Sequence, residues 1–221
     1  MSEDMELEYV VLTLDDLDDV VDFLAKYFYP REDVSLGTGL TQVDPIAGLC
    51  GQKICKSLTS GFSIGARERS TRRMVAVLTA DIMTSPSELT EAVYGSDPMA
   101  KIFRVLEIGW QKFNIFQDPG VERVLEIHRG CVHPDYCRRG IFTALVQKCI
   151  DVAQNDCQIV RIETTSLFSE KACVRLGFET RAIVDYSTLE DGLLDLSKMS
   201  FKVMKIMTKP LSAKPAEVPC I

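Results

Sequence analysis

A short segment around residues 131–143 combines residue types that can bind a phosphate group. Arg138 and Arg139 stand directly before Gly140, where an amphipathic pattern begins. The start of a helix leaves backbone N–H groups without acceptors and carries the positive end of the helix dipole. Arginine adds charge-assisted hydrogen bonds, and glycine permits close approach of the backbone. The segment therefore suits a pyrophosphate, although an ordinary strand-to-helix turn with a solvated basic pair explains these features equally well.

Two predicted elements position this segment. Residues 124–132 (VLEIHRGCV) are rich in β-forming residues and predict a strand that leads into it. Residues 140–155 repeat apolar side chains at spacings of three and four, which predicts an amphipathic helix that leads out of it. The loop between them then holds the two arginines at the start of the helix.

The rest of the chain reads as strands and helices in alternation. Asp97 before Pro98, and Asp44 before Pro45, each mark the start of a helix. Residues 30–40 (PREDVSLGTGL) are polar and contain glycine, so we expect a loop there. This order predicts an α/β fold with a mixed sheet and helices on both faces. Further strands are predicted at 7–14, 62–67, 74–83, 159–164, 178–186 and 201–207, and further helices at 17–28, 45–60, 98–116 and 169–176.

The composition bounds the class of protein. Of 221 residues, 46% are hydrophobic and 26% are charged, a balance typical of one folded domain. A net charge of −7 argues against a nucleic-acid surface, which needs clustered lysine and arginine. No apolar stretch approaches the roughly 20 residues of a membrane helix, and the acidic first residues are unlike a leader peptide. We expect a cytoplasmic monomer with a single domain over 1–208 and a flexible tail over 209–221.

Cysteine and histidine are placed unfavourably for a metal site. The eight cysteines form no CxxC pair, and the two histidines are His128 and His133. A zinc site needs such ligands at tight spacing, so we expect no metal. Cys131 would need an activating base to act as a nucleophile, and no His–Asp pair is placed in the sequence to supply one.

The phosphate-binding segment resembles the acetyl-CoA motif of the GNAT acetyltransferases. That motif is a strand, Val-x-Pro-x-Tyr, then Arg/Gln-x-x-Gly-x-Gly/Ala and a helix, and Val132, Pro134, Tyr136 and Gly140 match it. Residues 163–180 (ETTSLFSEKACVRLGFET) are similar to the family's strand-to-helix segment that ends in Leu-Gly-Phe-Glu. The resemblance implies the GNAT fold, with a central mixed, mostly antiparallel sheet.

The chain departs from this motif at two positions. Cys137 stands where Arg or Gln is usual, and the bulky Phe142 stands where Gly or Ala is usual. Arg138 and Arg139 offer electrostatic compensation. The resemblance implies acetyl-CoA as cosubstrate, with these candidate contacts: Cys131, Val132, Cys137, Arg138, Arg139, Gly140, Ile141, Phe142 and Thr143.

A second resemblance concerns the acceptor. Residues 27–40 (YFYPREDVSLGTGL) are similar to the F-x-x-D-E-P-L segment of the insect arylalkylamine N-acetyltransferases. It implies that Glu32 is the general base and that the acceptor is a small primary amine. Asp33 replaces the usual proline, which favours a second cationic group, as in agmatine or a diamine; a tolerated surface aspartate is the equal alternative. Ser169 matches a serine of that branch and is expected to hydrogen-bond the sulfur, or to cap the helix at 169–176.

The implied reaction is direct acetyl transfer in a ternary complex. The amine must lose a proton before it attacks the thioester, so a base is needed. Backbone N–H groups of Cys131 and Val132 are the expected donors to the developing oxyanion. Two alternatives share the fold: a protein or peptide N-acetyltransferase, and a catalytically silent acyl-CoA-binding module.

Overall fold

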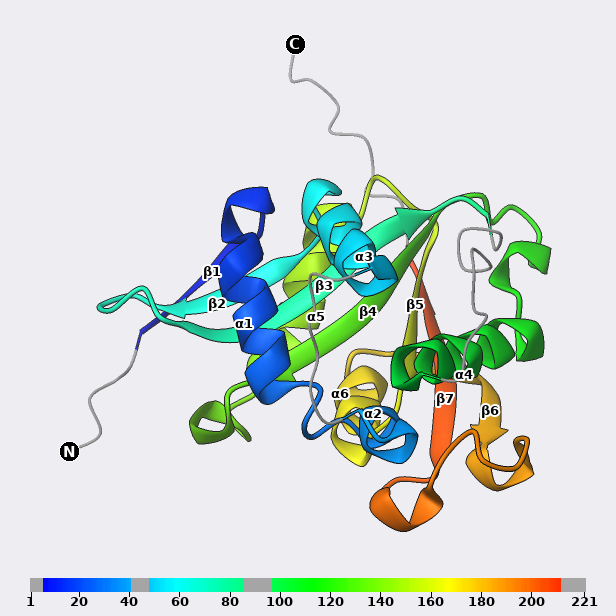
Figure 1. The fold of residues 1–221 in the computed structure, drawn as a ribbon. Coiled ribbons are helices and arrows are strands. Elements are labelled where there is room, and N and C mark those ends of the chain that lie inside the picture. Colours follow the sequence, from blue (N-terminus) through cyan, green and yellow to red (C-terminus); the bar gives the residue numbers. More distant parts are fainter. Residues whose placement is uncertain (1–5, 41–47, 86–96, 212–221) are drawn as a thin grey trace.

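The computed structural model describes residues 6–40, 48–85 and 97–211. Within them, seven strands form one sheet in the order β1-β2-β3-β4-β5-β7-β6 (Figure 1). β4 and β5 run parallel, and the other neighbouring pairs are antiparallel. The predicted mixed, mostly antiparallel sheet is therefore confirmed. The strands are β1 (Leu7–Val11), β2 (Ile64–Glu68), β3 (Met74–Met83), β4 (Val124–Val132), β5 (Ile159–Thr164), β6 (Glu179–Asp185) and β7 (Val203–Pro210).

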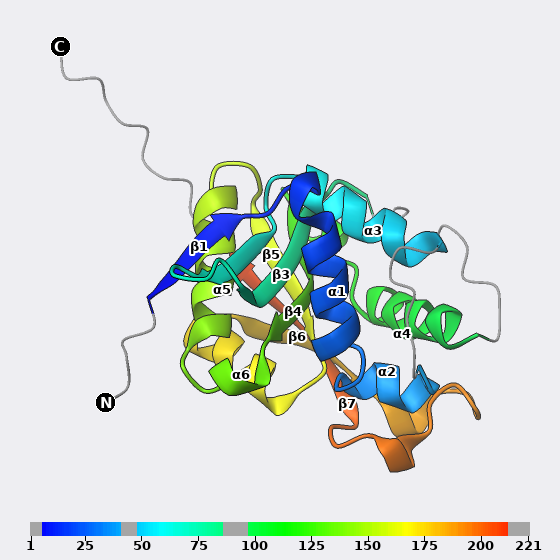
Figure 2. The ribbon, with the colours of Figure 1, turned by 60° about the vertical axis from the view of Figure 1, so that its left-hand side comes forward.

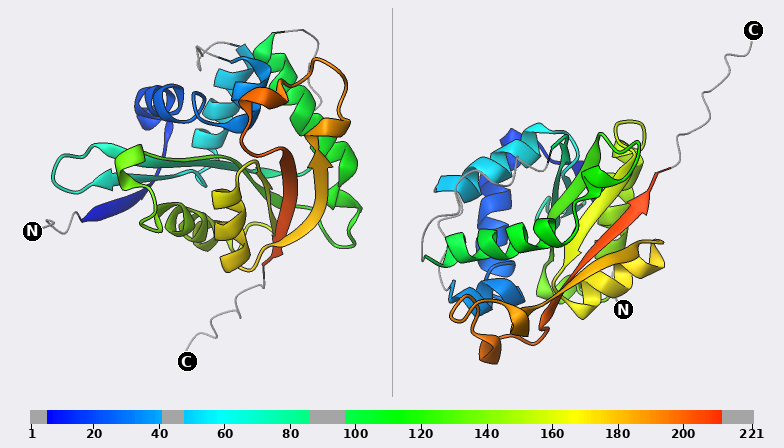
Figure 3. Two further views of the ribbon diagram at one scale, coloured as in Figure 1. Left: turned by 90° about the horizontal axis from the view of Figure 1, so that it is seen from below. Right: turned by 90° about the vertical axis from the view of Figure 1, so that its right-hand side faces the viewer.

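Helices cover both faces of the sheet. α1, α3 and α4 lie on one face, and α5 and α6 lie on the other (Figures 2 and 3). Leu145 and Cys149 of α5 pack in a core with Val75, and Leu24 of α1 packs in a second core with Val77. Because Val75 and Val77 lie on the same strand, β3 contributes to both. The helices are α1 (Leu17–Tyr27), α2 (Asp33–Thr38), α3 (Gly48–Thr59), α4 (Pro98–Lys112), α5 (Ile141–Ala153) and α6 (Leu167–Arg175).

Capping decides where two helices begin. Asp97 accepts hydrogen bonds from the N–H groups of Met99 and Ala100 at the start of α4, as its position before Pro98 predicts. The expected loop at 30–40 is wrong, because it contains the six-residue α2. Caps rather than apolar periodicity define that helix, so the pattern of apolar residues does not reveal it. The cap predicted at Asp44 and Pro45 lies outside the described residues.

The last strand runs past the expected domain boundary at 208. β7 continues to Pro210, which pairs with Ile159 of β5. The tail expected at 209–221 therefore begins as part of the sheet, and residues 212–221 lie outside the described part. In the described residues, no helix has the length and apolar content to cross a membrane.

A gap opens between the two parallel strands. Pairing of β4 with β5 ends at Ile127 and Ile162, whereas β4 continues to Val132. Beyond Ile127, the edge of β4 that faces β5 is therefore free to bind another group through its backbone. This gap is where the predicted site residues gather.

Candidate active site

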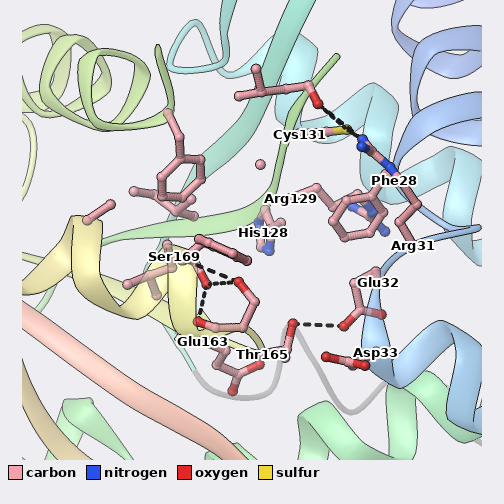
Figure 4. Close-up of a pocket in the computed structure, with 18 of the residues that line it drawn as sticks. Phe28, Arg31, Glu32, Asp33, His128, Arg129, Cys131, Glu163, Thr165 and Ser169 are labelled. Carbon is pink, nitrogen blue, oxygen red and sulfur yellow. Dashed lines mark hydrogen bonds between the residues drawn. The ribbon is translucent and has the colours of Figure 1, made fainter. Parts of the chain in front are cut away.

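A cavity of about 1050 Å³ occupies the gap between β4 and β5. All predicted site residues except Arg139 line it. The cavity has two sides. We call Val132 and residues 137–143 the α5 side, and Glu32, Asp33, Arg129 and Thr165 the α2 side. Figure 4 shows the residues of the α2 side, with Ser169 across the cavity from Arg31.

On the α5 side, the helix start offers free backbone donors. Gly140 precedes α5 with a φ of 76° and provides no side-chain cap. The first intrahelical bond runs from the N–H of Ala144 to the carbonyl of Gly140 (3.0 Å). The N–H groups of residues 141–143 therefore have no acceptor within the helix. This arrangement fits a phosphate group.

The two arginines of the loop have different roles. Arg138 lines the cavity and holds a φ of 64°, which is unusual for a residue with a side chain. Arg139 donates to the carbonyl of Asp135 (3.0 Å) and lies over the ring of Tyr136 (5.2 Å). Arg139, which was predicted to contact the cosubstrate, instead braces the loop and is not among the residues that line the cavity.

Two basic residues that the sequence analysis missed also line the cavity. Lys171 and Arg175 lie one turn apart on α6. Their spacing of four is a usable signal for a shared helix face. However, exposed basic pairs at this spacing are common, so only the fold shows that they face the cavity.

Phe142 is accommodated by a glycine on the neighbouring strand. A Cβ atom at Gly130 would overlap the ring of Phe142. The bulky side chain therefore occupies space that Gly130 leaves free. The departure from the motif at Phe142 is therefore compensated at Gly130, twelve residues earlier in the chain.

Strand register decides which backbone groups face the gap. The N–H of His133 donates to the carbonyl of Val75 on β3 (2.8 Å). Backbone groups of successive residues point to opposite edges of a strand in an antiparallel ladder. The N–H of Cys131 therefore also faces β3, whereas the N–H of Val132 faces the gap. Of the two expected oxyanion donors, only the N–H of Val132 therefore faces the gap, and the N–H of Cys131 is directed towards β3.

The Cys131 side chain is not poised as a nucleophile. Burial raises the pKa of the Cys131 thiol to about 11, although Arg31 lies close and opposes the rise. Arg31 donates to the Cys131 sulfur (3.4 Å) and to the carbonyl of Val132 (3.1 Å). At neutral pH the thiol is protonated, which agrees with the sequence argument against acyl-enzyme chemistry.

Glu32 is the N-cap of α2. Its Oε1 accepts bonds from the N–H of Val34 (3.0 Å) and the hydroxyl of Thr165 (2.8 Å). Its Oε2 accepts bonds from the N–H (2.7 Å) and the hydroxyl (2.8 Å) of Ser35. The carboxylate is therefore fixed by four donors, two of them hydroxyls that are free to rotate. Thr165 also ties α2 to the loop after β5 (Figure 4).

Asp33 is engaged by backbone groups. Its Oδ1 accepts from the N–H of Ser200 (2.6 Å) and its Oδ2 from the N–H of Phe201 (3.1 Å). The carboxylate thus holds α2 against the segment before β7. This structural use weakens the expectation that Asp33 attracts a second cationic group, because each oxygen already has a donor.

Ser169 lies inside α6 rather than at its cap. Ser166 is the N-cap and accepts from the N–H of Ser169 (3.2 Å). The hydroxyl of Ser169 donates to the carbonyl of Ser166 (3.0 Å) and lines the cavity. The predicted cap role of Ser169 is therefore wrong by three positions, because the helix begins at Leu167.

A buried ionic cluster that the sequence analysis missed lies at the cavity. Arg161 is fully buried and donates to Glu126 (2.5 Å) and to Glu163 (2.6 Å). Its guanidinium lies 3.8 Å from the centre of the Trp110 ring. Burial raises the pKa of Glu126 to about 8, with Arg161 opposing the rise. The sequence does contain a signal for this cluster, because Glu126, Arg161 and Glu163 are charged residues within predicted strands that have few polar positions.

β4 contains a β-bulge at His128. Thr79 pairs with Arg129 and Ala80 pairs with Ile127, so His128 has no residue opposite it. Such a bulge bends a strand and redirects its side chains. His128 Nε2 lies 2.9 Å from Asp81. No cluster of three or more His, Cys, Asp or Glu side chains within the described ranges could hold a metal ion.

Part of the chain matches a known protein family. Residues 106–178 match the profile of the acetyltransferase (GNAT) family. Among solved structures, arylalkylamine N-acetyltransferase 2 from Aedes aegypti is similar with 22% identity and a TM-score of 0.83, over 94% of this chain and 100% of that one. The Drosophila melanogaster polyamine N-acetyltransferase, which forms N-acetylagmatine, is 17% identical with a TM-score of 0.82, over 93% and 100%.

A third solved structure widens the range of relatives. Arabidopsis thaliana NAA60, in complex with a bisubstrate analogue, is 14% identical with a TM-score of 0.55, over 95% of this chain and 100% of that one. A search of curated proteins finds no match. The family profile and the shared fold agree with the motif, the strand gap and the free start of α5. Residues 106–178 therefore match the GNAT acetyltransferase family, and the described chain has the GNAT fold.

Proposed function

We propose that the protein is an acetyl-CoA-dependent N-acetyltransferase of a small primary amine, of arylalkylamine or agmatine-like type, with Glu32 as general base. One observation carries this proposal: a single cavity joins the free backbone of β4 and α5 to a fixed carboxylate on α2. Holding the thioester and the amine together in one cavity allows direct transfer, so the reaction needs no covalent enzyme intermediate.

The α5 side fits acetyl-CoA. The N–H groups of residues 141–143, together with Arg138, would hold its pyrophosphate, and Lys171 and Arg175 supply further positive charge. When bound, acetyl-CoA supplies an activated acetyl group as a thioester. The N–H of Val132 faces the gap and is the donor available to the carbonyl oxygen.

Glu32 would take the amine proton through a hydroxyl. Because four donors surround its carboxylate, a direct approach by the amine would displace one of them. The hydroxyls of Thr165 and Ser35 already donate to Glu32, so either can pass a proton to it while accepting one from the amine. Ser169 is the candidate hydrogen-bond donor to the departing sulfur.

The acceptor wall is largely apolar. Phe28, Phe103 and Trp110 line the cavity together with Met99 and Leu106. Such a wall suits an aryl or alkyl body next to the amine. The hydrogen bonds of Asp33 to backbone groups give less support to a diamine than to an aromatic or alkyl amine.

The test measures binding and turnover separately. Acetyl-CoA and CoA should each raise the melting temperature, because both bind the folded state. Release of free thiol is then followed with tyramine, tryptamine, agmatine and a peptide with a free N-terminus. Stabilisation by CoA without thiol release from any acceptor would identify a silent acyl-CoA-binding module. Turnover with the peptide alone would identify a peptide acetyltransferase.

A further inference from the structure

We propose that the acceptor carries an anionic group, most simply a carboxylate, in addition to its amine, and that Arg129 binds this group. The inference rests on the proposed function and deepens it by naming the substrate class. It describes an acceptor of the amino-acid type.

Arg129 is a cation on the α2 side that has no anionic partner among the residues that the structure describes. Its Nε donates to the hydroxyl of Tyr29 (3.1 Å), and its Nη2 lies 3.8 Å from the sulfur of Cys50. No carboxylate of residues 6–40, 48–85 or 97–211 forms an ion pair with it. Burial raises the pKa of Tyr29 to about 12, so that hydroxyl stays neutral. A guanidinium has five N–H donors, and most of those of Arg129 are unused.

The acids of the cavity already have donors. Glu32 accepts four hydrogen bonds and Asp33 two. Glu163 is paired with Arg161, which also binds one oxygen of Glu126. The other oxygen of Glu126 has no partner, but burial raises the pKa of this carboxyl group. These acids therefore leave the charge of Arg129 unneutralised.

A partly shielded cation without a counter-ion is costly to keep. Withdrawing a guanidinium from water loses solvation that the neutral hydroxyl of Tyr29 replaces poorly. Binding a carboxylate through two parallel N–H donors would recover that loss. The geometry therefore favours an anion in the cavity at this position.

The position of Arg129 assigns this anion to the acceptor. Arg129 contacts Tyr29 and Cys50, so its side chain lies on the face of the sheet covered by α1 and α3. The next residue, Gly130, contacts Phe142 of α5 on the opposite face. Figure 4 shows Arg129 beside Phe28 and on the same side of the cavity as Glu32, away from the α5 start that fits the pyrophosphate.

The bound anion takes no part in bond making. The amine nitrogen forms a bond to the thioester carbonyl carbon, and the bond from that carbon to sulfur breaks. One amine proton goes towards Glu32, and the departing thiolate takes up a proton. The carboxylate of the acceptor stays intact and serves to orient the amine.

Matched acceptors test the inference. Each pair differs only in the anionic group: arginine and agmatine, tyrosine and tyramine, β-alanine and propylamine, γ-aminobutyrate and butylamine. In at least one pair the acid-bearing member should have a kcat/KM roughly ten- to a hundredfold higher, as expected for a charge-assisted hydrogen bond. If the plain amine is preferred in every pair, the inference is overturned.

Variants locate the effect. Arg129→Gln should bring the ratio of kcat/KM between the acid-bearing member and the plain amine close to one, whereas Arg129→Lys should keep part of the preference. The control Arg175→Gln removes one charge from the other end of the same cavity and should leave the ratio within each pair unchanged. An equal loss for both members in Arg129→Gln would contradict the inference. If that variant does not fold, Arg129→Lys decides by the same ratio.

A binding measurement separates the inference from the proposed function. Calorimetry measures the affinity of each amino acid for the protein saturated with CoA. Absence of turnover with every acceptor would defeat the proposed function, yet acid binding that is lost in Arg129→Gln would still support the anion site. Turnover of amines without detectable binding or acetylation of any acid would overturn the anion site alone.

Discussion

The two sides of the cavity are built in different ways. The α5 side is one continuous segment of chain, and its donors are backbone N–H groups of residues 141–143. The α2 side combines Glu32 with Arg129 and Thr165. These two residues lie about a hundred or more positions after Glu32 in the chain. A continuous backbone site leaves a pattern in the sequence, whereas an assembled side-chain site does not. The difference also predicts that substitutions will act unequally on the two sides.

The largest effect is expected from Glu32→Gln on the α2 side. Removing a positioned base should lower kcat by about 10²–10⁴-fold. The affinity for acetyl-CoA should change by less than about twofold, because the α5 side is untouched. Steady-state kinetics and a CoA thermal shift check this, with the exposed Glu122→Gln as the control. Near-normal turnover across the pH range would remove Glu32 from the mechanism.

Arg161→Met tests the ionic cluster that supports the α2 side. The change leaves the buried Glu126 and the partly buried Glu163 without their cation, which should cost about 3–5 kcal/mol of unfolding free energy. The matched control Arg138→Met on the α5 side should stay within about 0.5 kcal/mol, because Arg138 is exposed. Urea denaturation measures both. A loss below about 1 kcal/mol for Arg161→Met would show that the cluster is not held as an ion pair.

Asp81 contacts His128 at the β-bulge, and its contribution to stability should depend on pH. Burial raises the pKa of Asp81, but His128, Lys56 and Ser57 outweigh it and lower the value from 3.8 to about 2. A lowered folded-state pKa contributes stability above pH 3.8, and this contribution is lost as the pH falls through about 2. The shift corresponds to about 2 kcal/mol.

Urea denaturation at several pH values checks this effect. The gap in unfolding free energy between wild type and Asp81→Asn should be widest near pH 5 and close towards about pH 2. A gap that is independent of pH would show that the Asp81 carboxylate is not stabilised by charge in the folded state.

The smallest effects are expected from losing the loop arginines on the α5 side, first Arg138→Gln and then Arg139→Gln. Because backbone donors do most of the binding there, losing one exposed side-chain charge should weaken acetyl-CoA about two- to tenfold. Arg139→Gln should change the affinity less, since its side chain braces the loop. Calorimetry with acetyl-CoA measures both. An effect of Arg139→Gln as large as that of Arg138→Gln would place both arginines in the cavity.

The local elements could be predicted from the sequence, because each depends on neighbouring residues. Alternating and helical periodicity gave β4 and α5, and Asp97 with Pro98 gave the start of α4. The α2 helix escaped prediction because it is six residues long and is fixed by the cap of Glu32. The start of α6 was misplaced for a related reason: several serines could cap it, and the fold selects Ser166.

The sequence by itself determined the α5 side, since the strand, the loop from Val132 to Gly140 and the helix follow one another along the chain. Tertiary structure alone decided which backbone donor faces the gap, because that depends on the register of β4 against β3. It also brought Arg161 between two glutamates and, within the described part of the chain, left Arg129 without an anion. Such pairings depend on contacts between distant segments, which the spacing of residues along one segment does not encode.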